Sequence, residues 1–183
     1  MKSVHVLACI LSLTALGAQS AAAPIAAPDV PAGLRPPAGQ VLSAEALATG
    51  VQIYECAAKP GDAAGYEWVF RSPEAVLGDR SGGTIGKHYA GPTWESNDGS
   101  AVSGEVASRD PGPSASAIPW LLLKAKTNSG SGVFSNVTNV QRVQTVGGIA
   151  PTEACSAANL KQLARVPYTA TYYFYRAGSA SAY

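Results

Sequence analysis

Charged residues are scarce in this chain of 183 residues. Lysine, arginine, aspartate and glutamate together make up 14% of it, against roughly a quarter in ordinary soluble domains. The 13 basic and 12 acidic residues nearly balance, and they form no run or stripe of one sign. Nucleic acids and anionic membrane surfaces both require a concentrated positive field. The sequence therefore predicts no nucleic-acid partner.

Histidine is rarer still, with two in the whole chain, and His5 lies in the apolar segment at the start. His88 alone is left for chemistry, which argues against a zinc site built from several histidines and cysteines. His-Glu-x-x-His and Gly-x-Ser-x-Gly motifs are absent. The glycine-rich segment 82–86 lacks the spacing of a dinucleotide-binding loop. We expect no metal and no cofactor, and we reject a nicotinamide-dependent dehydrogenase.

Long apolar runs are also few, and the one that occurs lies at the start of the chain, in residues 4–16. It follows Lys2 and precedes small residues that end at Ala23. This order is typical of a secretory signal peptide, and the run is too short to span a membrane. The sequence VLAC at 6–9 resembles a lipoprotein cleavage box, but the apolar run continues past Cys9 to Leu16. We predict a signal peptide at 1–23, a secreted or periplasmic protein, and no membrane span.

Removal of that segment leaves two of the three cysteines, Cys56 and Cys155. An even number of cysteines in an exported protein favours a disulfide. A bridge between residues so far apart would strongly constrain the unfolded chain. Two buried free thiols are the alternative. In either case we interpret the pair as structural.

Glycine and proline are plentiful, with 19 and 13 residues. Prolines at 24, 28, 31, 36 and 37 predict an extended lead-in over 24–37, with Val30 and Leu34 as possible anchors. A β-rich domain over 38–178 and a tail over 179–183 follow. Short runs rich in β-branched and aromatic residues lie between glycines, prolines and turn residues; they are 51–56, 66–71, 74–77, 84–90, 93–96, 118–127, 133–146 and 168–176. About ten short strands of this kind predict an all-β, single-domain sandwich or barrel.

Local patterns add detail to this prediction. The turn Asn97-Asp98-Gly99-Ser100 predicts a hairpin that pairs 94–96 with 101–103. Apolar residues on both faces of 118–127 indicate a covered strand. The valine spacing in 133–146 predicts a strand with a bulge. Residues 43–49 are expected to form one helical turn, and 152–165 to form the one short helix.

The strand at 168–176 alternates two sets of aromatic residues. Tyr168, Tyr172 and Phe174 lie at one set of positions, and Tyr173 and Tyr175 lie at the other. Core packing accounts for one face, while the other face could line a groove or cover a neighbouring strand.

Residues 88–100 gather the most chemically useful side chains. The ligand-binding candidates in this segment are Tyr89, Trp94, Glu95, Asn97 and Asp98. In the functional interpretation the aromatic rings stack on a ligand, and the polar groups hydrogen-bond to it. In the structural interpretation Trp94 is core, Asn97 and Asp98 serve the turn, and His88 pairs locally.

Three functions remain open. The leading hypothesis is an exported, non-enzymatic β-domain that binds a small molecule, a glycan or a protein partner. The second is a secreted hydrolase in which His88 acts as base, supported by Glu95, Asp98 or Asp110. The third is a structural protein of the cell envelope without a discrete site.

The motifs of the chain also carry a resemblance. They are GVQIYEC (50–56), HYAGPTWE (88–95), DGS (98–100), IPWLLLK (118–124), GGIAP (147–151) before Cys155, and VPY (166–168). Together they resemble the DUF3455 family, uncharacterised secreted proteins of bacteria and fungi. The resemblance implies a secreted domain with its two cysteines bonded, and it brings no established activity. Some relatives carry a malate dehydrogenase label, which the missing nucleotide fingerprint does not support.

Overall fold

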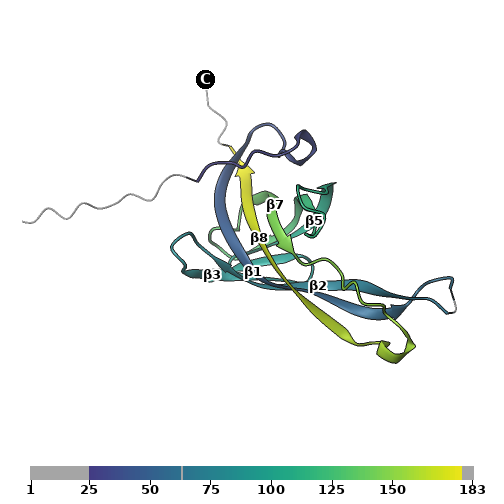
Figure 1. Ribbon diagram of the computed structural model, residues 1–183. Coiled ribbons are helices and arrows are strands. Elements are labelled where there is room, and N and C mark those ends of the chain that lie inside the picture. Colours follow the sequence, from purple (N-terminus) through teal and green to yellow (C-terminus); the bar gives the residue numbers. More distant parts are fainter. Residues whose placement is uncertain (1–24, 63, 179–183) are drawn as a thin grey trace, which may run out of the picture.

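The protein is one antiparallel sheet of eight strands closed into a barrel (Figure 1). The computed structural model describes residues 25–62 and 64–178, so the predicted signal peptide at 1–23 and the tail at 179–183 lie outside the described residues. The strands are β1 (Gln40–Ala58), β2 (Tyr66–Gly78), β3 (Thr84–Tyr89), β4 (Thr93–Ser96), β5 (Ala101–Asp110), β6 (Trp120–Ser129), β7 (Val137–Gly147) and β8 (Leu163–Ala177). The predicted all-β class is confirmed, and of the two architectures the barrel is the one observed.

Each strand pairs with the next one along the chain, and β8 returns to pair with β1. Closure pairs the strands on both sides within the barrel, whereas residues 66–74 of β2 pair with β1 alone. The strands are fewer and longer than expected. In particular, β1 includes residues 43–49, for which a helical turn was predicted. That turn is wrong: Ala44, Ala46 and Ala48 pair with β8, and the last two are buried in the core. The alanines at alternate positions face the crowded interior, where only small side chains have room. One isolated turn of helix would be unstable by itself.

The predicted hairpin between β4 and β5 is present, but its register is shifted by one residue from that of a two-residue turn, which would place Trp94 opposite Ser103. Trp94 lies opposite Val102, and Glu95 lies opposite Ala101. Gly99 adopts φ 84° in the connecting turn, a conformation that glycine adopts without a steric penalty. The predicted bulge is present in β7, where the register against β8 shifts between Val143 and Val146.

The expected helix at 152–165 is reduced to one short 3-10 turn, η2 (Ala157–Asn159). Ser156 and Asn159 cap this turn through reciprocal side-chain bonds. The residues from Leu163 onward extend β8 along β1, so the backbone pairing there replaces the helical bonds. Leu160 and Leu163, which are three residues apart, therefore do not form one face of a helix.

The alternation of β8 separates two apolar clusters. Tyr168, Tyr172 and Phe174 point into the barrel and join the main core. Tyr173 and Tyr175 point outward, where they pack in a second cluster on the outer surface. These outer tyrosines are buried, as the second of the two interpretations expected, but the element that packs on them is not a neighbouring strand.

The covering segment is the proline-rich lead-in with its short turn η1 (Ala32–Leu34). Val30 and Leu34 pack on the outer face of the barrel against Leu122 of β6 and Val143 of β7. The Nε2 of Gln141 donates to the backbone oxygen of Leu34 at 2.6 Å. Residues 121–123 of β6 are thus covered on both faces, as predicted, whereas Lys124 and residues 126–129 are exposed.

Replacing Leu34 by alanine is expected to lower the free energy of unfolding by about 2–4 kcal/mol, because a buried leucine loses both its transfer energy and its packing partners. The side chain is only 1% exposed. Urea unfolding of the variant measures the loss. Ile25→Ala, on the same lead-in but exposed, is the matched control and should change stability little. Equal effects of the two substitutions would show that the lead-in is not anchored at Leu34.

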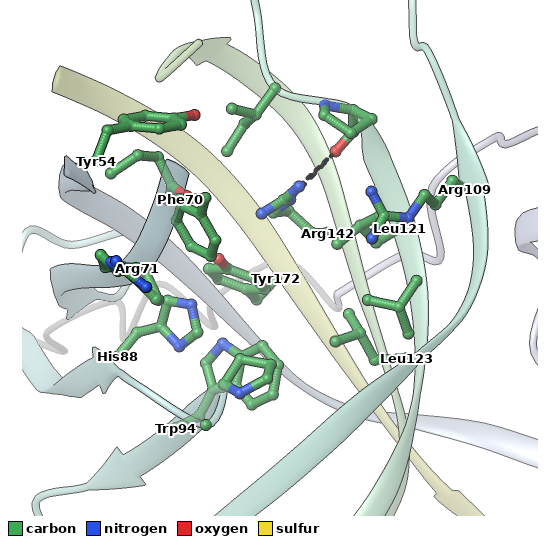
Figure 2. A pocket seen from close by; sticks show the side chains of 17 residues that line it. Tyr54, Phe70, Arg71, His88, Trp94, Arg109, Leu121, Leu123, Arg142 and Tyr172 are labelled. Atoms are coloured by element: carbon green, nitrogen blue, oxygen red, sulfur yellow. Dashed lines mark hydrogen bonds between the residues drawn. The ribbon is translucent and has the colours of Figure 1, made fainter. Parts of the chain in front are cut away.

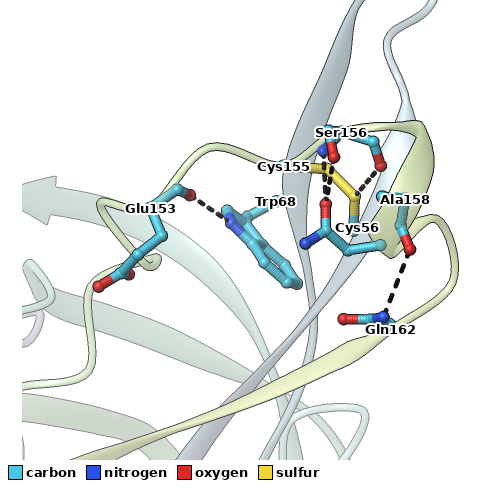
Figure 3. The surroundings of a disulfide bond; sticks show 8 residues. Cys56, Trp68, Glu153, Cys155, Ser156, Ala158 and Gln162 are labelled. Atoms are coloured by element: carbon cyan, nitrogen blue, oxygen red, sulfur yellow. Dashed lines mark hydrogen bonds between the residues drawn. A yellow bond between two sulfur atoms is a disulfide. The ribbon is translucent and has the colours of Figure 1, made fainter.

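Beyond the barrel, the end of β1 and the starts of β2 and β8 continue as a projecting arm (Figure 1). The loop between β7 and β8 lies along the arm and is fixed to it by the Cys56–Cys155 disulfide (Figure 3). Trp68 Nε1 donates to the backbone oxygen of Glu153 at 3.0 Å. The predicted disulfide is therefore present. Within the described residues, no helix has the length and apolar character needed to cross a membrane.

Candidate functional site

A cavity of about 570 Å³ occupies the arm-side end of the barrel interior (Figure 2). Its lining residues come from β1 to β8 and the connections between them; they are Gln52, Tyr54, Phe70, Arg71, Pro73, His88, Gly91, Pro92, Trp94, Val106, Arg109, Ile118, Pro119, Leu121, Leu123, Arg142 and Tyr172. The opposite end of the interior is filled by packed side chains such as Phe134 and Phe174. The cavity is therefore a local space within a core that is otherwise packed.

One wall of the cavity is aromatic. The β3–β4 register places His88 directly opposite Trp94. Their rings stack with centroids 4.6 Å apart and planes inclined by 13°. Tyr172 of β8 completes the group, its ring centroid 5.0 Å from that of His88. All three side chains are buried, so they present flat ring surfaces to the cavity and not to bulk solvent.

His88 is neutral. Its Nδ1 lies 2.8 Å from the backbone oxygen of Thr93, and because a carbonyl oxygen only accepts, Nδ1 carries the proton. Burial lowers the pKa of His88 to about 3, although the bond to Thr93 opposes the shift. The imidazole therefore offers an unprotonated Nε2, an acceptor, at neutral pH.

Arg142 is the charged group of the interior. It lies on β7 between Leu121 of β6 and Tyr172 of β8. Its Nε and Nη2 both donate to the backbone oxygen of Pro119, at 3.2 and 2.9 Å (Figure 2). No aspartate or glutamate is among the described residues that line the cavity. The guanidinium thus carries an uncompensated charge.

The charge of Arg142 acts on the groups around it. Burial raises the pKa of Tyr54, Tyr168 and Tyr172 and lowers that of His88, and in all four cases Arg142 lowers the pKa. A positive charge favours a phenolate and disfavours an imidazolium, which explains the common direction. The field of Arg142 therefore extends across the cavity.

Two buried donors on the cavity wall have no hydrogen-bond partner among the described residues. They are Nε2 of Gln52 and Nε1 of Trp94. Gln52 is 2% exposed. It lies close enough to Tyr168 to lower the pKa of that phenol, which burial raises, but the two groups make no hydrogen bond of ordinary geometry. Unpartnered buried donors are unusual in folded proteins.

The mouth of the cavity is apolar and basic. Phe70 and Val106 line it and remain substantially exposed. Arg71 lies beside Phe70 and pairs with Glu55 at 3.1 Å. Arg109 lies across the mouth and has no ion-pair partner among the residues that the structure describes.

The ligand-binding candidates from the sequence are divided between two faces of the sheet. Trp94 points into the cavity, as does His88. Tyr89 and Glu95 point outward, where the Tyr89 hydroxyl donates to Glu95 Oε2 at 2.8 Å. Lys87 pairs with the same carboxylate at 3.1 Å. The alternation of side chains along β3 and β4 separates the two sets.

Asn97 and Asp98 serve the hairpin turn. Asn97 Nδ2 donates to the backbone oxygen of Thr84, and Asp98 accepts from Ser100 and from the backbone N–H of Val133. The hydroxyl and backbone N–H of Ser100 and the N–H of Val133 lower the pKa of Asp98 to about 2. Both side chains therefore stabilise the turn and the segments beside it.

The acid–base group considered for a hydrolase is not assembled. No carboxylate of the described residues lies within ion-pair distance of His88. Glu95 lies on the outer face, and Asp110 accepts from the backbone N–H of Gly112 at 2.8 Å. In the described ranges, no three histidine, cysteine, aspartate or glutamate residues are grouped to hold a metal ion.

Sequence reasoning missed Gln52, Tyr54, Arg142 and Tyr172 as cavity residues. Gln52 and Tyr54 lie at alternating positions before Cys56, and that alternation could have identified them as inward-facing. Arg142 was harder to find, because a second register shift, between Val137 and Asn139, puts it out of step with the inward-facing Val137.

Comparison with known proteins supports the resemblance seen in the sequence. A family model with the description "Protein of unknown function (DUF3455)" matches residues 37–176. This match covers all eight strands except the last residue of β8. No curated protein and no solved structure matches the chain.

Proposed function

The chain belongs to the DUF3455 family, and we propose that its barrel binds a small, largely apolar molecule in the cavity at the arm-side end of the interior. The observation that carries the proposal is the cavity itself, in a barrel whose opposite end is packed. Its volume of about 570 Å³ lies in the range of small-molecule sites. Eight-stranded barrels have an interior wide enough for one such ligand.

The chemistry of the wall also supports a small-molecule ligand. Leu121, Leu123 and Trp94 provide apolar and aromatic surface, and a few polar groups are placed among them. A pocket of this composition binds through apolar contact and is oriented by its polar groups. An extended glycan fits the site less well, because stacking on a polymer needs exposed rings and the rings of His88, Trp94 and Tyr172 are buried.

The proposal includes export of the mature protein. It is supported by the signal-peptide pattern at 1–23 and by the disulfide, which forms and persists mainly in oxidising compartments. Expression with the leader, followed by mass spectrometry of the culture medium or periplasm, tests this part. A processed chain beginning between about residues 19 and 24 is expected. Full-length protein retained in the cytoplasm would contradict export.

The binding site is tested by blocking the mouth. Val106→Trp places a large ring at the entrance without burying it in the core, since Val106 is 40% exposed. We expect it to weaken binding of the neutral fluorescent probe N-phenyl-1-naphthylamine at least about tenfold, a change of 1.4 kcal/mol. Fluorescence titration gives the dissociation constants.

The matched control is Val146→Trp, which adds the same ring at a valine that is 65% exposed and does not line the cavity. Its affinity for the probe should equal that of the wild type. Equal affinities in all three proteins would place the probe outside the barrel and overturn the proposal.

A further inference from the structure

We infer that the ligand of the cavity carries one carboxylate, which binds to Arg142, while an uncharged ring or short chain packs against the aromatic wall. This inference rests on the proposed function and specifies the class of ligand. It depends on three observations. They are the unused N–H groups of Arg142, the absence of acidic residues among the described residues that line the cavity, and the two buried donors without a partner.

Arg142 has free donor capacity. A guanidinium has five N–H groups in one plane, and the hydrogen bonds of Arg142 to Pro119 involve only Nε and Nη2. Both bonds go to one uncharged carbonyl oxygen. A carboxylate matches the planar fork of a guanidinium through two parallel hydrogen bonds. Arg142 is therefore positioned on Pro119 with hydrogen-bonding capacity left for an anion.

The charge around the cavity favours an anionic ligand over a cationic one. Three arginines line it, and none of its described lining residues is acidic. Glu55 compensates Arg71 outside the cavity, which leaves Arg109 at the mouth and Arg142 inside. A cationic ligand would bring a further positive charge into this field. A carboxylate would neutralise the interior charge and be attracted at the mouth by Arg109.

Both buried side-chain atoms of the cavity wall that lack a hydrogen-bond partner among the described residues are donors. Nε2 of Gln52 and Nε1 of Trp94 are buried without partners, and both residues line the cavity with Arg142. The unprotonated Nε2 of His88 is an acceptor on the same wall. A ligand rich in hydroxyl groups needs acceptors as well as donors, whereas a carboxylate only accepts. The wall therefore fits an apolar monocarboxylate better than a sugar.

A pair of ligands with the same shape tests the inference in the wild-type protein. Naphthalene-2-carboxylate and naphthalene-2-carboxamide differ by one charge and are otherwise closely similar in size. Each is titrated against the bound neutral probe at pH 7.5. We expect the carboxylate to bind at least about tenfold more tightly than the amide, since hydrogen bonds to charged groups are the stronger class.

Variants of Arg142 assign the preference to that residue. Arg142→Gln should abolish the carboxylate preference, whereas Arg142→Lys should keep part of the preference through its charge. The matched control is Arg176→Gln, which removes an exposed positive charge outside the cavity and should keep the full preference. The lysine variant and the wild-type ligand pair decide the question if the glutamine variant does not fold.

Equal affinities of the wild type for the carboxylate and the amide would overturn the inference, and so would failure of both to displace the probe. A carboxylate preference that survives Arg142→Gln would do the same. In each of these cases the proposed function still stands if the neutral probe binds Val106→Trp more weakly than Val146→Trp. Loss of that distinction overturns the proposed function itself.

Discussion

Replacing both Cys56 and Cys155 by serine is expected to lower the free energy of unfolding by about 4–5 kcal/mol. The two residues are separated by 99 positions, so the bridge removes much of the freedom of the unfolded chain. In the folded protein it holds the β7–β8 loop on the arm, and that loop carries the Gly148 oxygen to which the Tyr54 hydroxyl donates at 2.7 Å. Urea unfolding at pH 7.5 measures the change.

The wild type treated with a reductant is the internal control. It should lose about the same stability as the double variant, and the reductant should have no effect on the variant itself. A loss below about 1 kcal/mol would show that contacts other than the disulfide, such as the bond from Trp68 to Glu153, suffice to hold the loop. The structural role assigned to the cysteine pair would then be wrong.

Acidification is expected to destabilise the protein through His88. Burial lowers its pKa in the native state to about 3, against an ordinary value of 6.5. Below pH 6.5 the unfolded chain therefore binds a proton that the native protein does not. Above pH 6.5 His88 is neutral in both states and has no effect on stability. Below pH 6.5 the free energy of unfolding falls by about 1.4 kcal/mol per pH unit, to a total loss of about 5 kcal/mol near pH 3.

His88→Phe removes this titration while it keeps a flat ring beside Trp94. Unfolding of both proteins is measured between pH 6.5 and 4.5. The carboxylates with lowered pKa values, Glu45, Glu95 and Asp98, begin to contribute only near the lower limit of this window, and they do so equally in both proteins. The wild type should lose about 2–3 kcal/mol across this window, and the variant should lose little. Parallel curves for the two proteins would mean that His88 is protonated in the native state.

Much of the fold could be predicted from local patterns. The turn at 97–100 indicated the β4–β5 hairpin, although not its register to the residue, and the even number of cysteines indicated the disulfide. The prediction of a helix over 152–165 was wrong because of contacts between distant parts of the chain. Leu163 and the residues after it pair with the backbone of β1, which no local pattern reveals. Helical spacing of leucines carries little weight when a long neighbouring strand is available for pairing.

The site was predicted less completely. Proximity in sequence grouped Tyr89, Trp94 and Glu95, yet adjacent residues of a strand point to opposite faces, so Trp94 alone of the three lines the cavity. Arg142 and Gln52 are distant from that segment in sequence and meet it only when the barrel closes. The register shift between Val137 and Asn139 in β7 hides the inward position of Arg142. Closure and bulges are long-range features, which explains why the charged part of the site could be found only in three dimensions.

The most direct test of a ligand site inside the barrel is an NMR titration of the tryptophan side chains. The chain has three tryptophans, and each gives one indole N–H signal. Trp94 lines the cavity, Trp68 lies on the arm bonded to Glu153, and Trp120 packs against the cluster under the lead-in. Naphthalene-2-carboxylate should shift the Trp94 signal and leave the other two in place, and Val106→Trp should suppress that shift. A Trp94 signal that does not move while the ligand binds, or equal shifts of all three signals, would contradict binding in the barrel interior.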